Sequence, residues 1–250
     1  MIFTLPEFCQ NVMNAYESLD FGLRRHVRCP YYMNAGVRKR AASAVESGKG
    51  SPEEIIKEVK SCALIKKIDL AKLSGNEIRQ LMVDERIGID CSGLVSHILD
   101  PWVKEASHTT LGQSLLRTQY SLKRKLLLHF RPFQNIDVTL LTSLENAHGV
   151  LLTDIKPGDL IRTRGGKHVL LIYEVEKDQE RIISFSFVHS SDRFGDNSGI
   201  QRGKVLFTNS RGELHEQQWQ ESLPDQKPAL EGWLEEREKN GIFRLKCVAL

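Results

Sequence analysis

The spacing of the apolar residues changes along this chain, and that change constrains the fold more than any other feature. Before residue 100 the apolar residues recur every three or four positions, which is the spacing of an amphipathic helix. From residue 158 onward they fall in short runs rich in β-branched and aromatic residues, which is typical of β-strands. Helices first and strands afterwards predict an α+β fold.

Two helix starts carry complete capping signals. Ser51 and Ser74 each precede a glutamate by three residues, which is the capping box, and Pro52 occupies a first helical position. Apolar residues follow both signals at helical spacing. We predict one helix over 52–64 and a second helix that ends near Gly88.

A third helix is expected to begin at Asp90 or Cys91. Its apolar residues continue to Leu99, and Pro101 is expected to end it, because proline lacks the N–H that a helix interior needs. The pattern beyond this helix is mixed, with one further helix predicted over 115–128.

The second half of the chain predicts an antiparallel sheet. Segments of turn length separate the runs of strand-forming residues, so neighbouring strands are expected to form hairpins. Three strands are predicted at 158–164, 167–175 and 181–191, and two more at 203–207 and 242–248.

The hairpin of the second and third strands is expected to bring two histidines together. If its loop centres on Asp178 and Gln179, His168 falls directly opposite His189, on the same face of the sheet. A slip of one residue would put the two rings on opposite faces. The same register opposes three further pairs, which are Leu170 and Phe187, Ile172 and Phe185, and Glu176 and Arg181.

Composition narrows the classes of function. The 250 residues include 35 Lys and Arg against 32 Asp and Glu, a net charge of +3, which does not indicate a nucleic-acid-binding protein. The five cysteines are scattered and form no C-x-x-C pair, so neither a disulfide framework nor a zinc site is predicted. The GKG at 48–50 lacks the spacing of a phosphate-binding loop and predicts a turn.

The N-terminal residues do not resemble a targeting segment. Pro6, Glu7 and Gln10 interrupt the apolar residues, and no basic stretch precedes them, so no signal peptide is predicted. No window approaches eighteen apolar residues, the length that a spanning helix needs. We expect a cytoplasmic protein without a membrane partner, the alternative being export by an unconventional route.

Cys91 is the candidate nucleophile. A cysteine at a helix N-terminus lies among unpaired N–H groups at the positive end of the helix dipole, which lowers the pKa of the thiol. A nearby imidazole can exchange the proton, and a second polar group can orient that imidazole, roles that His168 and His189 can fill. Ser92 and Gly93 are small enough to let a substrate carbonyl approach the sulfur.

Two roles are open to Asp90. It can cap the helix that begins at Cys91, but its charge opposes formation of a thiolate. His97 lies six positions beyond the cysteine, on another face of the helix, so a structural role is predicted for it.

Four motifs together resemble a known family. DCSGLV at 90–95, KPGDL at 156–160, KHVLLIY at 167–173 and FVHSS at 187–191 follow one another in this order. They resemble the DCSGLV, PGDL, HVGIY and VHAS segments of the NlpC/P60 cysteine peptidases. The similarity extends over roughly residues 88–191.

The resemblance implies a papain-like fold, in which the nucleophile helix packs on an antiparallel sheet, with extra N-terminal helices. It implies that Cys91, His168 and His189 form a catalytic Cys-His-His triad. It also implies hydrolysis of amide bonds in bacterial cell-wall peptides, with a peptide or muropeptide as partner and without metal or cofactor.

The chain departs from the family pattern at three places. Leu170 stands where the family's strand has glycine, and the segment 102–150 is longer than in compact members. The family's Y-x-x-G-G segment is missing before the cysteine, and Tyr31 or Tyr32 is the candidate for its displaced tyrosine. The candidate substrate-binding residues are therefore Asp90, Ser92, Gly93, Tyr31 and Tyr32.

Two alternatives to a peptidase stay open. One is an acyltransferase or other amidase on the same fold, and the other is a non-catalytic domain that binds a peptide or a glycan. The resemblance implies a helical region at 1–87 followed by an NlpC/P60-like catalytic domain at 88–250, with an insertion at about 102–150. The sequence does not predict an oligomeric state.

Overall fold

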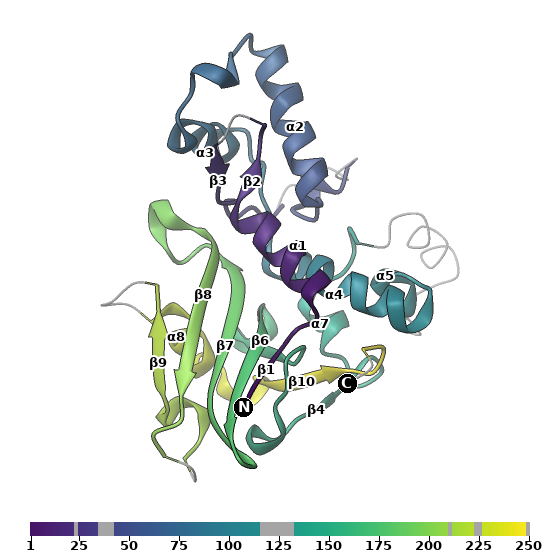
Figure 1. Ribbon diagram of the computed structural model, residues 1–250, viewed down its shortest axis with the longest axis vertical. Coiled ribbons are helices and arrows are strands. Elements are labelled where there is room, and N and C mark those ends of the chain that lie inside the picture. The colour runs from purple at the N-terminus through teal and green to yellow at the C-terminus, as the bar shows by residue number, and fades with distance from the viewer. Residues whose placement is uncertain (23–24, 35–42, 116–132, 210–211, 223–226, 249–250) are drawn as a thin grey trace.

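Helices form the first part of the chain and strands the second, as the spacing of apolar residues predicts (Figure 1). The computed structural model describes residues 1–22, 25–34, 43–115, 133–209, 212–222 and 227–248. Its α-helices are α1 (Glu7–Glu17), α2 (Pro52–Ile65), α3 (Gly75–Asp84), α4 (Cys91–Ser107), α5 (Leu111–Ser114), α7 (Val138–Leu141) and α8 (Pro228–Leu234). The predicted α+β class is confirmed.

Eight of the described strands form one antiparallel sheet, in the order β4-β10-β5-β6-β7-β8-β9, with β1 also pairing with β6. They are β1 (Ile2–Thr4), β4 (Ala147–Gly149), β5 (Leu160–Thr163), β6 (His168–Asp178), β7 (Arg181–Ser191), β8 (Gly199–Leu206), β9 (Gln218–Glu221) and β10 (Gly241–Leu245). The short strands β2 (Leu19–Asp20) and β3 (His26–Val27) pair separately among the N-terminal helices. All five predicted strands are present.

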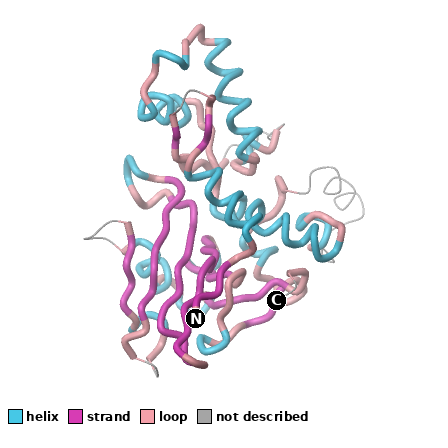
Figure 2. Tube along the Cα trace, viewed as in Figure 1, coloured by secondary structure: helices cyan, strands magenta, loops and turns pink. Residues whose placement is uncertain are grey.

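The sheet has a hydrophobic core on each side. Helix α4 contacts β6 and β7, and its buried residues share one core with α1, α2 and α3. In Figure 2 most helices, in cyan, lie in the upper part of the molecule and the strands of the sheet, in magenta, in the lower part. The second core lies around Trp219 and Phe187 and includes Ala229 from α8. The N-terminal helices therefore pack against α4, and α4 connects them to the sheet.

The two capping signals are confirmed. The Ser51 and Ser74 hydroxyls accept hydrogen bonds from the N–H groups three residues on, and the glutamates there bond back to the serine N–H groups. Helix α3 ends at Asp84, however, earlier than predicted. Gly88 is needed for a different reason, because a Cβ there would lie 2.4 Å from the carbonyl oxygen of Pro30.

The expectation that Pro101 ends the third helix is wrong. Helix α4 continues through it to Ser107, where His108 closes the helix in the left-handed conformation. A proline removes the hydrogen bond to the carbonyl four residues earlier and crowds that carbonyl, but the residues beyond it can still form helical hydrogen bonds. The turn beyond it is stabilised by the fully buried Val103 and by an ion pair of 2.6 Å between Lys104 and Asp100.

The predicted hairpin register is wrong by two residues. The loop centres on Gln179 and Glu180, so Asp178 opposes Arg181, and two irregularities shift the pairing further along. Observed partners are Ile172 with Phe187 and Val175 with Phe185, in place of Leu170 with Phe187 and Ile172 with Phe185. Near the histidines Leu171 opposes Val188, which makes His168 and His189 diagonal rather than direct neighbours. A two-residue shift keeps both rings on one face.

Two further expectations concern the predicted helix over 115–128 and the absence of a membrane-spanning segment. Most of the helix predicted over 115–128 falls on residues 116–132, which lie outside the described residues. In the part of the chain that the structure describes, no helix is both long and apolar enough to span a bilayer.

Candidate active site

Cys91 is the first residue of α4, with Asp90 as its N-cap. The Asp90 side chain accepts a hydrogen bond of 2.6 Å from the N–H of Gly93, and its carbonyl accepts one from Leu94. Cys91 itself is 5% exposed. The sequence correctly places the cysteine at a helix N-terminus, but the cap is a carboxylate and the thiol is buried.

A buried lysine lies against this cap. The Lys49 ammonium donates to Asp90 Oδ1 over 2.7 Å and also to the hydroxyl of Ser92. The Ser92 hydroxyl is in addition 3.2 Å from the carbonyl of Ile136. Two candidate substrate-binding residues, Asp90 and Ser92, are therefore held by contacts within the protein.

The GKG turn packs directly on the start of α4. The Asp90 N–H donates to the Gly48 carbonyl over 2.9 Å, and a Cβ on Gly93 would lie 2.8 Å from that same carbonyl oxygen. His97 Nε2 lies 2.8 Å from the Lys49 carbonyl, which gives this histidine the structural role predicted for it. The space beside Gly93 is thus filled by the turn, not left open for a substrate.

The thiol of Cys91 is less acidic than its place on the helix predicts. Burial raises its pKa to about 11, and the Asp90 carboxylate adds to this effect. The Lys49 ammonium and the N–H groups of Val169 and Ser92 act in the opposite direction but do not outweigh burial. The expected lowering of the pKa is therefore wrong for the free protein, in which Cys91 is a neutral thiol at neutral pH.

His168 and His189 form a hydrogen-bonded pair at the ends of β6 and β7. Nε2 of His168 lies 2.8 Å from Nδ1 of His189, and both side chains are buried. Phe187 and Phe194 each contact the His189 ring edge-to-face, with ring centroids 5.8 and 5.7 Å apart. The predicted meeting of the two imidazoles is confirmed.

Both imidazoles are neutral at neutral pH. Burial lowers the pKa of His168 well below its usual range, and His189, Arg164 and Arg193 lower it further. Burial also lowers the pKa of His189, again with a contribution from Arg164. Each ring therefore carries one proton, and one of the two facing nitrogens donates to the other.

The structure ties the cysteine to the histidine pair through the backbone. The hydroxyl of Ser190, next to His189, donates over 2.7 Å to the carbonyl of Ile89, two residues before Cys91. The N–H of Val169, next to His168, contacts Cys91 and acts to lower the pKa of its thiol. Within the described ranges the sulfur itself forms no hydrogen bond to either imidazole.

The two candidate tyrosines differ in their surroundings. Tyr31 pairs with Ile89 in an isolated β-bridge, and its hydroxyl lies 3.5 Å from the sulfur of Met33. Burial raises the pKa of Tyr31, and charge on Cys91 raises it further, which places Tyr31 beside the site. For Tyr32 the structure gives backbone contacts, an N–H that donates to Ile89 and a carbonyl against Gly48.

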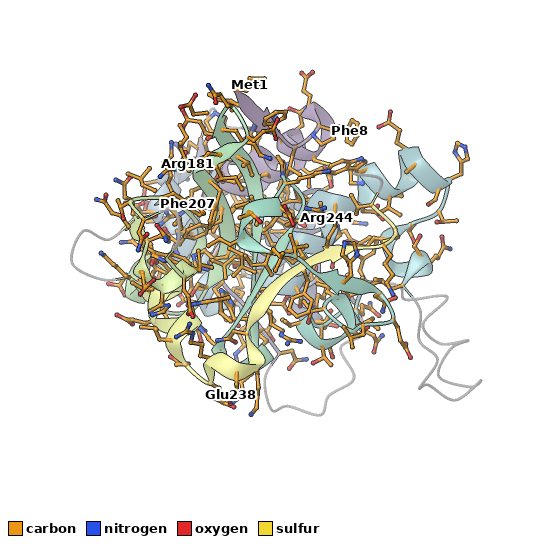
Figure 3. The ribbon with its side chains drawn as sticks, turned by 90° about the horizontal axis from the view of Figure 1, so that it is seen from below. Met1, Phe8, Arg181, Phe207, Glu238 and Arg244 are labelled. Atoms are coloured by element: carbon orange, nitrogen blue, oxygen red, sulfur yellow. The ribbon has the colours of Figure 1, made fainter. Side chains whose placement is uncertain are left out.

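The PGDL motif supports the sheet rather than the site. Asp159 is fully buried and accepts two hydrogen bonds from Arg244, of 2.7 and 2.8 Å, where β10 crosses the view in Figure 3. Gly158 has a φ of 98° and donates its N–H to Ile172. This motif fixes the turn that leads into β5.

Arg164 is a site residue that the sequence did not indicate. It follows β5 with a φ of 54°, a left-handed conformation that is unusual outside glycine. Its guanidinium donates to Asp192 over 2.8 Å and to the hydroxyl of Ser191 over 3.0 Å, and its charge acts on both histidines. Lys49 was likewise missed, because GKG indicates only a turn.

Neither a metal site nor the described cavity coincides with these residues. Among the residues that the structure describes, no group of three or more His, Cys, Asp or Glu is arranged to hold a metal ion. A cavity of about 340 Å³ lies at the turn of the β6–β7 hairpin, lined by Arg181 and Phe207 among others (Figure 3). It is at the opposite end of the hairpin from the histidines.

Comparison of the chain with protein-family models, with curated proteins and with solved structures finds no match. The link to the NlpC/P60 peptidases therefore stays a resemblance of four motifs.

Proposed function

We propose that this protein is a cysteine hydrolase that cleaves an amide or peptide bond through a thioester on Cys91. The observation that carries the proposal is the His168–His189 hydrogen bond, tied to the start of α4 through Ser190 and Ile89. A thiol at a helix N-terminus beside an oriented imidazole is the arrangement of a nucleophile with its base. The four motifs support a papain-like fold of the NlpC/P60 type.

The bond between the imidazoles limits the tautomers that can work. Nδ1 of His168 is the nitrogen that does not face His189, so it is the one available to the thiol. It accepts a proton only if Nε2 of His168 carries the other proton and donates it to Nδ1 of His189. His189 is then protonated at Nε2 and acts by holding His168 in this tautomer.

The reaction begins from a neutral thiol and a neutral imidazole. As the sulfur attacks the carbonyl carbon, its proton passes to Nδ1 of His168, and N–H groups at the start of α4 stabilise the oxyanion. Collapse breaks the C–N bond, and the amine leaves with the proton from His168. Water then attacks the thioester and gives its proton to His168. His168 returns this proton to the leaving sulfur, which releases the acid and restores the neutral thiol of Cys91.

The substrate class follows from the resemblance. Peptides of the bacterial cell wall are the class that NlpC/P60 peptidases hydrolyse, and the proposal extends this class to the present chain. Tyr31 is the substrate-binding candidate that the geometry favours, because it lies beside Cys91.

The test is hydrolysis of a panel of muropeptides by the wild-type protein and by the Cys91→Ala and His168→Gln variants. We expect amine release from the wild type, an acyl-enzyme mass on the peptide that contains Cys91, and neither product with Cys91→Ala. Transfer of the acyl group to an added amine in preference to water would identify an acyltransferase. Equal turnover by wild type and Cys91→Ala would reject the proposal.

A non-catalytic binding domain is the second candidate. The observation that favours it is the burial of Cys91, which raises the pKa of the thiol to about 11. In that case muropeptides would bind to wild type and Cys91→Ala with equal affinity and remain intact. Calorimetry on the same panel distinguishes the two functions.

A further inference from the structure

Asp90 creates a conflict at the start of α4. Its carboxylate caps the helix through the N–H of Gly93, and a cap of this kind stabilises a helix. The same negative charge lies one residue from the proposed nucleophile and raises the pKa of Cys91. A neutral serine or asparagine would cap the helix without this effect.

The position of Lys49 resolves this conflict. Its side chain is 6% exposed and the Asp90 side chain 8%, so the ion pair is screened little by solvent. The ammonium bonds to the same oxygen, Asp90 Oδ1, that caps Gly93. The cap is therefore retained while its charge is balanced beside Cys91.

We propose that Lys49 is a positioning residue of the Cys91 site, whose buried ammonium neutralises the Asp90 cap and clamps the GKG turn to the start of α4. The assignment of this role to catalysis rests on the proposed function. Lys49 acts through Asp90 and Ser92, and it is not required to touch the substrate.

Three hydrogen bonds fix the backbone of Gly48 and Lys49, from which the ammonium extends. The N–H of Lys49 donates to Ala44, its carbonyl accepts from His97, and the neighbouring Gly48 carbonyl accepts from Asp90. Gly48 has a φ of 73°, and a Cβ there would lie 2.4 Å from the Tyr32 carbonyl oxygen. The conformation of the turn thus places the Lys49 side chain against the Asp90 carboxylate.

A second ion pair on the same helix offers a comparison. Asp100 is buried and accepts a hydrogen bond of 2.8 Å from the N–H of Leu111, so it too is a buried carboxylate that binds a backbone N–H at the start of a helix. Its partner Lys104 is 53% exposed, whereas Lys49 is enclosed. The enclosed lysine is the one beside the proposed nucleophile.

The titratable groups around Cys91 come from several elements. Lys49 from the turn, Asp90 from the cap and Tyr31 interact electrostatically with the thiol. His168 and His189 lie at the ends of β6 and β7, where the N–H of Val169 contacts Cys91. Because both histidines are neutral at neutral pH, Asp90 and Lys49 are the charged groups that act on the pKa of the thiol. Removing either one should shift the titration of the thiol, in opposite directions.

The experiment is an ultraviolet titration of the Cys91 thiolate, taken as the difference between each protein and the same protein with Cys91→Ser. Lys49→Met should raise the midpoint by about one pH unit or more, which is a tenfold loss of thiolate at fixed pH. Asp90→Asn should lower the midpoint. Lys49→Arg and the double variant Lys49→Met/Asp90→Asn should return it close to the wild-type value.

Lys104→Met is the matched control, since it removes the lysine partner of the other buried carboxylate on α4. It should leave the Cys91 midpoint unmoved. The proposal is overturned if Lys49→Met and Asp90→Asn shift the midpoint in the same direction, if neither shifts it, or if Lys104→Met shifts it equally. Should Lys49→Met not fold, an unchanged midpoint in Asp90→Asn alone overturns it.

This titration uses no substrate. Opposite shifts in a protein that cleaves no peptide would support the role of Lys49 and reject the hydrolase. Turnover without these shifts would support the hydrolase and reject the role of Lys49.

Discussion

The two halves of the site are stabilised in different ways. At the start of α4 the side chains are charged, and each charge has a buried partner, as in the Lys49–Asp90 pair. At the ends of β6 and β7 the histidine pair is kept neutral by burial among aromatic rings. One half depends on paired charge, whereas in the other burial and the positive charge of Arg164 both keep the imidazoles neutral.

This difference separates two kinds of mutational effect. Removing one partner of a buried ion pair leaves an unsatisfied charge, which lowers the free energy of unfolding. Disturbing the packing around the pair lowers it as well. Replacing a neutral imidazole by a neutral amide leaves no charge behind, so stability at neutral pH should change little. Substitution of the histidines should therefore act mainly on the rate, whereas changes in the packing around the Lys49–Asp90 pair should act mainly on the stability.

The largest effect is expected for His168→Gln. Loss of the base should lower kcat/KM by about 10²–10⁴-fold, the contribution typical of general acid–base catalysis. The free energy of unfolding at pH 7 should stay within about 1 kcal/mol of the wild type, because glutamine retains a polar group toward His189. Muropeptide hydrolysis and urea unfolding measure the two quantities.

His148→Gln is the control for this prediction, since His148 is an exposed residue of β4. It should change neither quantity. Loss of stability without loss of rate in His168→Gln would invert the comparison between the two halves.

The second effect is a dependence of stability on pH. Burial lowers the pKa of His168 and of His189 in the folded protein, whereas histidines in the unfolded chain titrate near pH ~6.5. Below that pH the unfolded chain binds protons that the folded chain does not, so the free energy of unfolding falls as the pH falls. The slope should reach about 1.4 kcal/mol per pH unit for each histidine.

His189→Gln isolates this contribution. Urea unfolding of wild type and variant at pH 7 and pH 5 should give a smaller loss of stability in the variant. The slope of its free energy of unfolding against pH should be smaller by up to about 1.4 kcal/mol per pH unit, the contribution of one histidine. Carboxylates titrate alike in both proteins and cancel in the difference. Equal losses would mean that the histidine pair is protonated in the folded protein.

Local signals in the sequence predicted the elements well. The capping boxes at Ser51 and Ser74 are satisfied within four residues, so their geometry does not depend on the rest of the fold. Pro101 misled because tertiary packing of Val103 compensates for the missing hydrogen bond of one proline. The short edge strands β1 and β4 lack a distinctive local pattern and were not predicted.

The site was predicted as far as its residues could be placed by local rules. His168 and His189 were brought together despite a wrong register, because an even shift preserves the face of the sheet. Lys49 lies 41 residues before Asp90, and nothing in a GKG turn indicates that its lysine is buried. The pKa of Cys91 was missed for the same reason, since burial is a property of the whole fold.

The third effect tests packing at the helix half. Gly93→Ala would place a Cβ 2.8 Å from both the Gly48 carbonyl oxygen and Cδ1 of Ile89. Such overpacking should lower the free energy of unfolding by about 1–3 kcal/mol, measured by urea unfolding. Gly75→Ala is the matched control, because its nearest neighbour would be 3.6 Å away, and it should change stability by no more than about 0.5 kcal/mol. Equal effects of the two substitutions would show that the GKG turn yields easily.

The smallest effect concerns the tyrosine that borders both halves. Tyr31 responds to charge on Cys91 and on Asp90 from the helix half and to Arg164 from the strand half, whereas Tyr32 is placed by its backbone. If the Tyr31 hydroxyl binds the substrate, Tyr31→Phe removes one hydrogen bond and should raise KM about two- to tenfold with kcat unchanged. Tyr32→Phe should leave both constants at the wild-type values. A fall in kcat for Tyr31→Phe, with KM constant, would instead place its hydroxyl at the reacting atoms. Tyr31 would then act in catalysis together with the start of α4 and the histidine pair.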